Sequence, residues 1–172
     1  MKNDLIIRRL SKDDLKQGFE LRLESLQDAP ANFMTSYEEE KLSGFPLYQN
    51  ILNNDETNNV IFGTFIERKL VGMLGICQEN RSKTKHKAII WGMYVQPAYR
   101  NQGFGKALFK EVLEYAKHSI KCSVINLTVE ENNTSAKELY KAFGFKEWGM
   151  EPQAMQMDGH YFNECHMSLI MR

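Results

Sequence analysis

Residues 95–108, Val-Gln-Pro-Ala-Tyr-Arg-Asn-Gln-Gly-Phe-Gly-Lys-Ala-Leu, combine the residue types and spacings of this chain best suited to chemistry. Gly103 and Gly105 are two positions apart, and glycine lets backbone N–H groups face a ligand without a Cβ atom in the way. A helical pattern begins at once, and a helix start has unpaired N–H groups and a partial positive charge. Arg100 and Lys106 add full positive charges. The segment therefore predicts a site for a phosphate or pyrophosphate group.

Two common phosphate-binding motifs do not fit this segment. A Walker loop requires Ser or Thr after its lysine, whereas Ala107 follows Lys106 here. A dinucleotide-binding fingerprint requires a third glycine at position 108, which is occupied by Leu108. The remaining pattern is Arg-x-x-Gly-x-Gly after a strand. It resembles the acetyl-CoA loop of the GCN5-related N-acetyltransferase (GNAT) superfamily, which has the form Gln/Arg-x-x-Gly-x-Gly/Ala.

A second motif supports the same resemblance. Residues 127–145 read Leu-Thr-Val-Glu-Glu-Asn-Asn-Thr-Ser-Ala-Lys-Glu-Leu-Tyr-Lys-Ala-Phe-Gly-Phe. The family often has a strand, an Asn, a short helix with Ala and Leu-Tyr, and then Gly-Phe, and all of these occur here in that order. The resemblance covers most of the chain and is most specific from Ile89 to Phe145.

The resemblance implies which residues meet acetyl-CoA. The backbone of Met93, Tyr94 and Val95 would bind the pantetheine arm, which can pair with a strand edge as a peptide does. Asn133 matches a family Asn that contacts the cofactor. The pyrophosphate would be held by the following residues: Arg100, Asn101, Gln102, Gly103, Phe104, Gly105 and Lys106. Simpler alternatives stay open, since Arg100 and Lys106 could be solvated charges and Asn133 a helix cap.

The implied reaction is transfer of an acetyl group from the thioester to a primary amine, by direct attack in a ternary complex. A backbone N–H near Tyr94 or Val95 could stabilise the developing oxyanion. Tyr140 matches a family Tyr near the cofactor sulfur and is the candidate catalytic residue, although a core aromatic is the alternative. With reference pKa values of about 10 for Tyr and about 8.5 for a thiol, full proton transfer is uphill by about 2 kcal/mol, so a hydrogen bond to the thiolate is sufficient.

The amine must also lose a proton, which at pH 7 costs about 4.6 kcal/mol for an alkyl amine with a pKa of about 10.4. Some relatives carry Glu where this chain has Thr128, and Thr cannot act as a base at neutral pH. Glu130, Glu131, Glu151 or a water chain could take this role, and the sequence does not choose among them.

The sequence is less informative about the residues that would bind the acceptor amine. Glu24 and Asp28 are four apart on a predicted helix and share a face, where they could attract a cationic amine or form a solvated acidic surface. His160 and Tyr161, in a segment resembling a family hairpin, could line the acceptor pocket or pack within the hairpin. His86, His118 and His166 are too dispersed to predict a metal site, so no metal is expected.

Composition narrows the class of protein. A length of 172 residues with 42% apolar residues predicts a single domain over residues 1–172 with a real core. A net charge of zero argues against a nucleic-acid partner. The sequence shows no apolar run long enough for a membrane span, no apolar core of a signal peptide, and three scattered cysteines typical of reduced thiols, which together favour the cytoplasm.

Strand and helix patterns alternate along the chain. Strands are predicted at 5–9, 60–66, 70–77, 88–95, 124–129, 145–149 and 161–170. Helices are predicted at 12–27, after Gly103 and after a cap at Asn132 or Asn133, with a partly helical segment at 33–52 that Gly44 and Pro46 interrupt. Residues 88–95 are nearly all apolar, as in a strand covered on both faces. The fold class is α/β (mixed α+β).

The resemblance adds the arrangement: a mostly antiparallel sheet of six or seven strands, flanked by about four helices and splayed at the cofactor strand. The expected function is an acetyl-CoA-dependent N-acetyltransferase acting on a small-molecule amine. Acetylation of a protein N-terminus or lysine is the alternative, and a non-catalytic acyl-CoA-binding regulator or a nucleotide-phosphate enzyme are rivals from other classes. Dimers are frequent in the family, which leaves a homodimer open.

Overall fold

A seven-stranded mixed sheet forms the centre of the computed structural model, which describes residues 5–54 and 58–171. The strands are β1 (Leu5–Arg9), β2 (Asn59–Ile66), β3 (Lys69–Gln78), β4 (Lys87–Val95), β5 (Val124–Glu130), β6 (Lys146–Met157) and β7 (His160–Ile170). Their order across the sheet is β1-β2-β3-β4-β5-β7-β6, and only β4 and β5 are parallel. The expected mostly antiparallel sheet is therefore confirmed.

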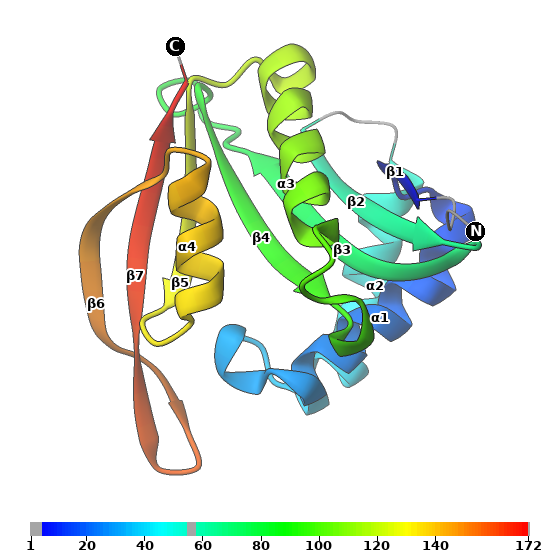
Figure 1. Cartoon of the computed structure of the whole chain (residues 1–172), viewed down its shortest axis with the longest axis horizontal. Coiled ribbons are helices and arrows are strands. Elements are labelled where there is room, and N and C mark those ends of the chain that lie inside the picture. Colours follow the sequence, from blue (N-terminus) through cyan, green and yellow to red (C-terminus); the bar gives the residue numbers. More distant parts are fainter. Residues whose placement is uncertain (1–4, 55–57, 172) are drawn as a thin grey trace.

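Helices cover both faces of the sheet. They are α1 (Leu15–Asp28), α2 (Tyr37–Asn53), α3 (Phe104–Tyr115) and α4 (Thr134–Ala142). Figure 1 shows α3 and α4 on the near face and α1 and α2 behind the sheet. Short 3₁₀ turns lie at Lys12–Asp14, Pro30–Asn32 and Pro97–Tyr99, and a π-helical turn at Ala116–Ile120 follows α3. None of the helices in the described part of the chain is long and apolar enough to cross a membrane.

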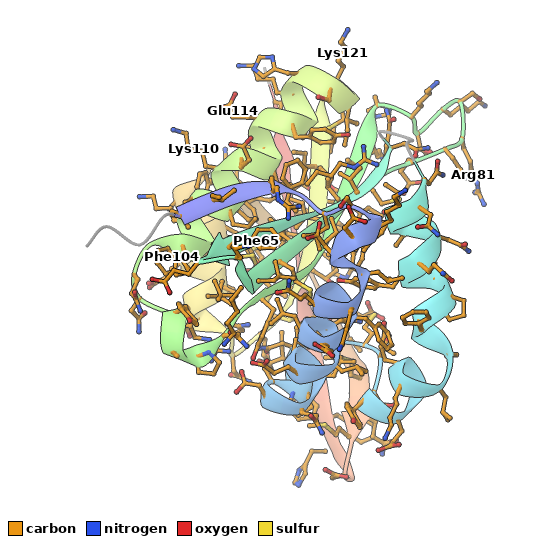
Figure 2. The ribbon with its side chains drawn as sticks, turned by 90° about the vertical axis from the view of Figure 1, so that its right-hand side faces the viewer. Phe65, Arg81, Phe104, Lys110, Glu114 and Lys121 are labelled. Atoms are coloured by element: carbon orange, nitrogen blue, oxygen red, sulfur yellow. The ribbon has the colours of Figure 1, made fainter. Side chains whose placement is uncertain are left out.

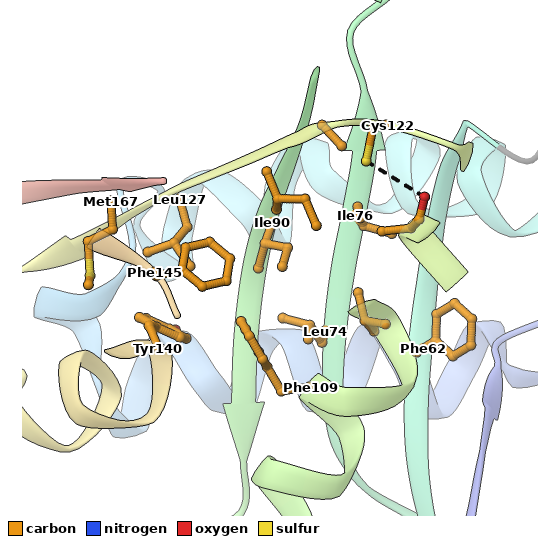
Figure 3. Close-up of a cluster of buried hydrophobic side chains, with 14 of the residues drawn as sticks. Phe62, Leu74, Ile76, Ile90, Phe109, Cys122, Leu127, Tyr140, Phe145 and Met167 are labelled. Atoms are coloured by element: carbon orange, nitrogen blue, oxygen red, sulfur yellow. Dashed lines mark hydrogen bonds between the residues drawn. The ribbon is translucent and has the colours of Figure 1, made fainter. Parts of the chain in front are cut away.

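The apolar stripe of α3 fills the core on the near face. Leu108, Phe109 and Val112 are fully buried against strand residues such as Leu74 and Ile90, as Figure 3 shows for several members of this cluster. A second cluster on the far face joins α1 and α2 to β2 and β3 and includes Tyr48, Ile61, Phe65 and Met73. Figure 2 shows these two helices lying across that face of the sheet. The helical spacing predicted for α3 is thus confirmed.

β4 and β5 separate along their length, which gives the sheet a gap. Their pairing is limited to Lys87–Ile89 with Val124–Asn126, and the two strands then diverge (Figure 1). Gly92 in β4 has a φ of +67°, and the pairing of β4 with β3 is irregular nearby. From residue 90 to residue 95, β4 therefore has no strand partner on its β5 side within the described chain. The expected splay is confirmed, and it leaves backbone groups available to a ligand.

The predicted interruption at Gly44 and Pro46 is wrong, because α2 runs through both residues. The helix is started by a capping box in which Ser36 accepts from the Glu39 N–H at 3.2 Å and Glu39 accepts from the Ser36 N–H at 2.9 Å. A Cβ at position 44 would lie 2.6 Å from a carboxylate oxygen of Glu40. Gly44 therefore makes room for the Glu40 side chain rather than ending the helix.

Two strand predictions also need correction. β4 is not covered on both faces: Ile89 is 42% exposed, and Trp91, Gly92 and Met93 are only partly buried. β6 extends to Met157 instead of ending at Gly149. It is an edge strand with two register shifts. An edge strand tolerates Pro152, because the N–H that proline lacks would have no neighbouring strand to donate to on the outer side.

Candidate functional site

Three adjoining cavities lie along the gap between β4 and β5. The large cavity has a volume of about 690 Å³. It is bordered by the end of β4, by residues 100–106, which we call the glycine loop, and by α4. The middle cavity, of about 90 Å³, shares Met93, Asn133 and Tyr140 with the large cavity. A third, the tryptophan cavity, has about 410 Å³, includes Trp91 and Trp148 in its wall, and shares Trp91 and Thr128 with the middle cavity. The shared walls indicate one passage across the sheet.

The glycine loop presents backbone N–H groups to the large cavity. Asn101 and Gly103 have positive φ angles of 60° and 82°, and Gly103 is the N-cap of α3. The first intrahelical bond runs from the Ala107 N–H to the Gly103 carbonyl at 3.0 Å, so the N–H groups before Ala107 are not used by the helix ladder. A Cβ at Gly105 would lie 3.1 Å from the end of the Met93 side chain. The absence of a side chain there lets the helix start lie close to β4, as a phosphate cradle requires.

Most of the residues predicted at this loop line the large cavity. The sequence-predicted residues in its wall are Met93, Tyr94, Val95, Arg100, Asn101, Gly103, Gly105, Lys106, Asn133 and Tyr140. Gln102 and Phe104 belong to the loop but are not in this wall: the Gln102 side chain donates to the Ala98 carbonyl at 2.9 Å, and the Phe104 ring packs against Tyr99. Their backbone, rather than their side chains, is what the loop offers to a ligand.

Arg100 is held by the protein itself. Its Nε donates to the Val95 carbonyl at 2.8 Å, and its guanidinium forms an ion pair with Asp28 on α1. Glu24 accepts hydrogen bonds from the Tyr94 hydroxyl at 3.1 Å and from the Gln96 amide at 2.7 Å. Burial, followed by the two carboxylates, raises the pKa of Tyr94 and keeps its hydroxyl a donor.

The contacts of Arg100 and Glu24 hold α1 against the end of β4 and the glycine loop. Glu24 and Asp28 share a face of α1, as predicted, but their carboxylates are engaged in these bonds, and neither residue is in the wall of the three cavities. The interpretation of this pair as an attractor for a cationic amine is not favoured.

Asn133 and Tyr140 each make contacts that stabilise the fold, and each also lines the large and the middle cavity. The Asn133 side chain accepts from the Ala136 N–H at 3.2 Å and caps α4. The Tyr140 ring packs 5.2 Å from Phe109 and is 6% exposed (Figure 3), so the predicted alternative of a core aromatic also holds. Burial raises the pKa of Tyr140 to about 12. Its hydroxyl has no hydrogen-bond partner in the described chain, and therefore it can donate to a group placed between the cavities.

The tryptophan cavity contains residues that sequence reasoning missed. Trp91 lies over Gly75 of β3, where a Cβ would overlap the indole ring. Trp148 packs against His166 with ring centroids 5.2 Å apart and the ring planes tilted by 48°. Arg22 is buried in the wall, paired with Glu40 at 3.4 Å. Glu164 is the one acidic residue of β7, which is the signal that could have identified it, whereas Arg22 is one of several charged residues of α1 and has no such signal.

The carboxylates proposed as bases are mostly engaged. Glu130 accepts two hydrogen bonds from Asn132, both at 3.0 Å. Glu131 accepts from the Asn163 amide at 3.0 Å, and Glu151 pairs with His166 at 3.3 Å on an exposed part of β6. Glu164 is instead buried, lines the tryptophan cavity, and has one carboxylate oxygen without a partner within the described residues.

Other predicted acceptor residues lie elsewhere. Asp158 and Gly159 form the tight turn of the β6–β7 hairpin with positive φ angles. His160 and Tyr161 follow this turn and are exposed, outside the walls of the three cavities. Hairpin packing, the alternative given for them, is therefore the better interpretation. Within the described residues, no three His, Cys, Asp or Glu side chains gather as metal ligands would, and the three cysteines are free thiols.

Known proteins resemble this chain in sequence. Residues 20–145 match the profile of the Acetyltransferase (GNAT) family. The L-amino acid N-acetyltransferase AaaT of Escherichia coli (strain K12) is 29% identical over 105 residues, covering 61% of this chain and 64% of that protein. The spermine/spermidine N(1)-acetyltransferase of Bacillus subtilis (strain 168) is 32% identical over 88 residues, covering 49% of this chain and 57% of that protein. The chain thus spans less than two thirds of the length of these curated relatives.

Solved structures share the fold over nearly the whole chain. An acetyltransferase of the GNAT family from Streptococcus pneumoniae superimposes with a TM-score of 0.80 at 21% identity, covering 98% of this chain and 100% of that one. The structure of yncA, a putative acetyltransferase from Salmonella typhimurium with its cofactor acetyl-CoA, gives 0.80 at 16% identity, covering 98% and 95%. At these identities the likeness establishes the fold. Together with the profile match over more than half of its length, it shows that the chain belongs to the Acetyltransferase (GNAT) family.

Proposed function

We propose that this protein is an N-acetyltransferase that moves an acetyl group from acetyl-CoA to a primary amine of a small molecule. The observation that carries the proposal is the passage across the sheet, in which the middle cavity shares walls with both larger cavities. A donor bound along the glycine loop and an acceptor bound in the tryptophan cavity would meet beside Tyr140. Direct transfer in a ternary complex follows from this arrangement, because both substrates can be present at once.

The chain's own residues fit the donor. The N–H groups of Asn101 to Lys106 and the exposed Lys106 side chain suit a diphosphate, since a helix start favours negative charge. The unpaired edge of β4 from Met93 to Val95 suits the amides of a pantetheine arm. Acetyl-CoA, when bound, supplies the acetyl group as a thioester. Arg100 supports this site indirectly, by fixing the loop to β4 and α1.

Tyr140 is the proposed catalytic residue. With a pKa of about 12 it stays protonated at neutral pH, and the residue lines both the large and the middle cavity. It would donate a hydrogen bond to the sulfur on which negative charge develops as the thioester bond breaks. Backbone N–H groups near Tyr94 and Val95 would stabilise the oxygen of the same thioester.

Two features favour a small acceptor. The tryptophan cavity has about 410 Å³, within the range of pockets for small molecules. The curated relatives are named for acceptors of this size, an amino acid in one case and spermine or spermidine in the other. Acetylation of a protein N-terminus or lysine is the second candidate, favoured by the exposure of Trp148 in the wall of the tryptophan cavity.

A thiol-release assay with acetyl-CoA and a panel of amines tests the proposal, paired with calorimetry of CoA binding. Release of thiol that depends on a small amine supports it. CoA binding without turnover of any small amine or peptide contradicts it and favours an acyl-CoA-binding regulator. Stabilisation by ATP that exceeds stabilisation by CoA in a thermal-shift titration would point instead to a nucleotide-phosphate enzyme.

A further inference from the structure

We propose that Glu164 receives the acceptor amine: its carboxylate binds the ammonium group and takes one of its protons. We further infer that the acceptor carries this single positive charge on an apolar or aromatic body. Both statements rest on the proposed acetyl transfer and name the acceptor side of that same site. Four features of the structure carry them: the burial of Glu164, its unpartnered oxygen, its direction, and the composition of the cavity wall.

Glu164 is an unusual buried carboxylate. The residue is 4% exposed, and its Oε2 atom has no hydrogen-bond partner in the described part of the chain. A buried charge without a partner is unfavourable, so such a group is expected to meet a cation or a donor. Glu164 lines the tryptophan cavity, where an external group could supply that partner.

The pleat of β7 directs Glu164 toward this cavity. Side chains alternate along a strand, and Cys165 and Met167 belong to the core cluster beneath α3 and α4. Glu164 and His166 therefore face the opposite side, where both line the cavity. His166 pairs in register with Thr128, which borders both the middle and the tryptophan cavity. Glu164 is thus two residues along β7 from His166, whose partner Thr128 borders the opening through which the acetyl group would arrive.

The neighbouring charged groups are already matched. Glu130, opposite Glu164 on β5, is held by Asn132, and Glu151, opposite it on β6, pairs with His166. Across the cavity, the Arg22 guanidinium forms an ion pair with Glu40 at 3.4 Å, although its Nε atom makes no hydrogen bond among the described residues. Among the described residues that line the cavity, Glu164 is accordingly the one carboxylate, and no cation of the wall is bonded to it.

The remaining wall is largely apolar and aromatic. Phe33, Trp91 and Trp148 surround the space that Glu164 faces. Aromatic faces attract a cation and also bury an apolar body. A polyamine would bring further positive charges into a cavity with no second carboxylate, whereas a monoamine leaves none unmatched.

The step is balanced as follows. Glu164 takes one proton from the ammonium group, and the neutral nitrogen forms a bond to the thioester carbon as the carbon–sulfur bond breaks. The nitrogen's second proton is then lost, the sulfur gains a proton to leave as a thiol, and the proton on Glu164 passes to solvent. The net products are an amide, a thiol and one proton.

Tryptophan fluorescence tests the inference without requiring turnover, because the chain has two tryptophans and both line the cavity. The protein is saturated with CoA and titrated with phenethylamine, with the uncharged 2-phenylethanol, and with spermidine. We expect phenethylamine to bind at least about tenfold more tightly than 2-phenylethanol, since a bond to a charged group is worth that much or more. Equal affinity of the wild-type protein for these two probes, or a preference for spermidine, overturns the inference.

Two variants complete the test. Glu164→Gln should remove the preference for the amine and lower kcat/KM in the thiol-release assay by about 100-fold, while its thermal shift with CoA stays unchanged. Glu20→Gln, at an exposed position of α1 outside the walls of the three cavities, should behave as wild type. A Glu164→Gln protein that binds and acetylates the amine as wild type does refutes the inference. Wild-type protein that binds CoA but acetylates no amine refutes the proposed function instead, and the fluorescence comparison still decides the role of Glu164.

Discussion

Replacing Tyr140 with Phe removes a single oxygen atom from the proposed catalytic position. The ring packs against Phe109 and Phe145, and Phe keeps these contacts. The hydroxyl has no hydrogen-bond partner within the described residues, so its loss should change the free energy of unfolding by less than about 1 kcal/mol. Any large change in turnover would therefore report on chemistry rather than on folding.

The size of the expected effect follows from the pKa of Tyr140. Burial raises this pKa to about 12, whereas a free thiol has a pKa of about 8.5, so complete proton transfer to the thiolate is uphill by about 5 kcal/mol. Tyr140 therefore acts as a hydrogen-bond donor and not as a full acid. Losing one donor aimed at developing charge costs about 10²–10³ in kcat, which is the fall we expect in Tyr140→Phe.

The assay is thiol release at saturating acetyl-CoA, together with calorimetry of acetyl-CoA binding. We expect the dissociation constant to stay within about twofold of wild type, since the lost interaction belongs to the transition state. Tyr37→Phe, on the first turn of α2 and away from the cavities, serves as the control. Because the raised pKa keeps Tyr140 protonated, wild-type kcat should show no loss from its ionisation below about pH 11. An unchanged kcat in Tyr140→Phe would refute this reasoning.

Three further predictions concern the cap, the loop and acid stability. Asn133→Ala should remove the α4 cap and lower the free energy of unfolding, measured with urea, by about 1 kcal/mol. Asn133→Ser should restore this stability but not the affinity for CoA, because Ser can cap the helix but lacks the amide. Full recovery of both would show that Asn133 is only a cap. Lys106→Ala should weaken CoA binding about three- to tenfold at low salt and less at high salt. Lys110→Ala, on the outer face of α3 (Figure 2), should leave CoA binding unchanged. Equal effects of the two variants would contradict a local contact between Lys106 and a phosphate. Arg8 lowers the pKa of Asp14, so the stability that this pair contributes is present at neutral pH and is lost as pH falls below 3.8. Asp14→Asn should therefore cost about 1 kcal/mol at pH 7, a value reduced by the half-exposed Arg8, and the difference from wild type should shrink as pH falls below 3.8.

Local patterns in the sequence were sufficient to predict the elements on the proposed donor side. The glycines at 103 and 105, the α3 stripe and the Asn133 cap are short-range features whose physics depends on neighbouring residues, and the structure has all of them. The passage of α2 through Pro46 was not predictable in this way, since the helix is held by packing against distant residues: Tyr48 and Ile51 belong to the cluster with β2 and β3.

The acceptor side depends on contacts between distant parts of the chain. Three different strands supply the cavity residues Trp91, Trp148 and Glu164. The alternation of side chains shows that each strand has two faces, but it does not show which face borders a cavity. The divergence of β4 from β5 decides this, because it opens the space that these residues line. Strand divergence is a property of the whole sheet, and no single segment encodes it.

The central claim is that the N–H groups of Asn101 to Lys106 bind the diphosphate of a CoA thioester. Isothermal titration calorimetry with acetyl-CoA, CoA and pantetheine tests it most directly, because pantetheine lacks the diphosphate. The account predicts saturable binding of acetyl-CoA and CoA and none of pantetheine at the same concentrations. Folded protein that gives no heat with acetyl-CoA or CoA at millimolar concentration, or that binds pantetheine equally well, would contradict it.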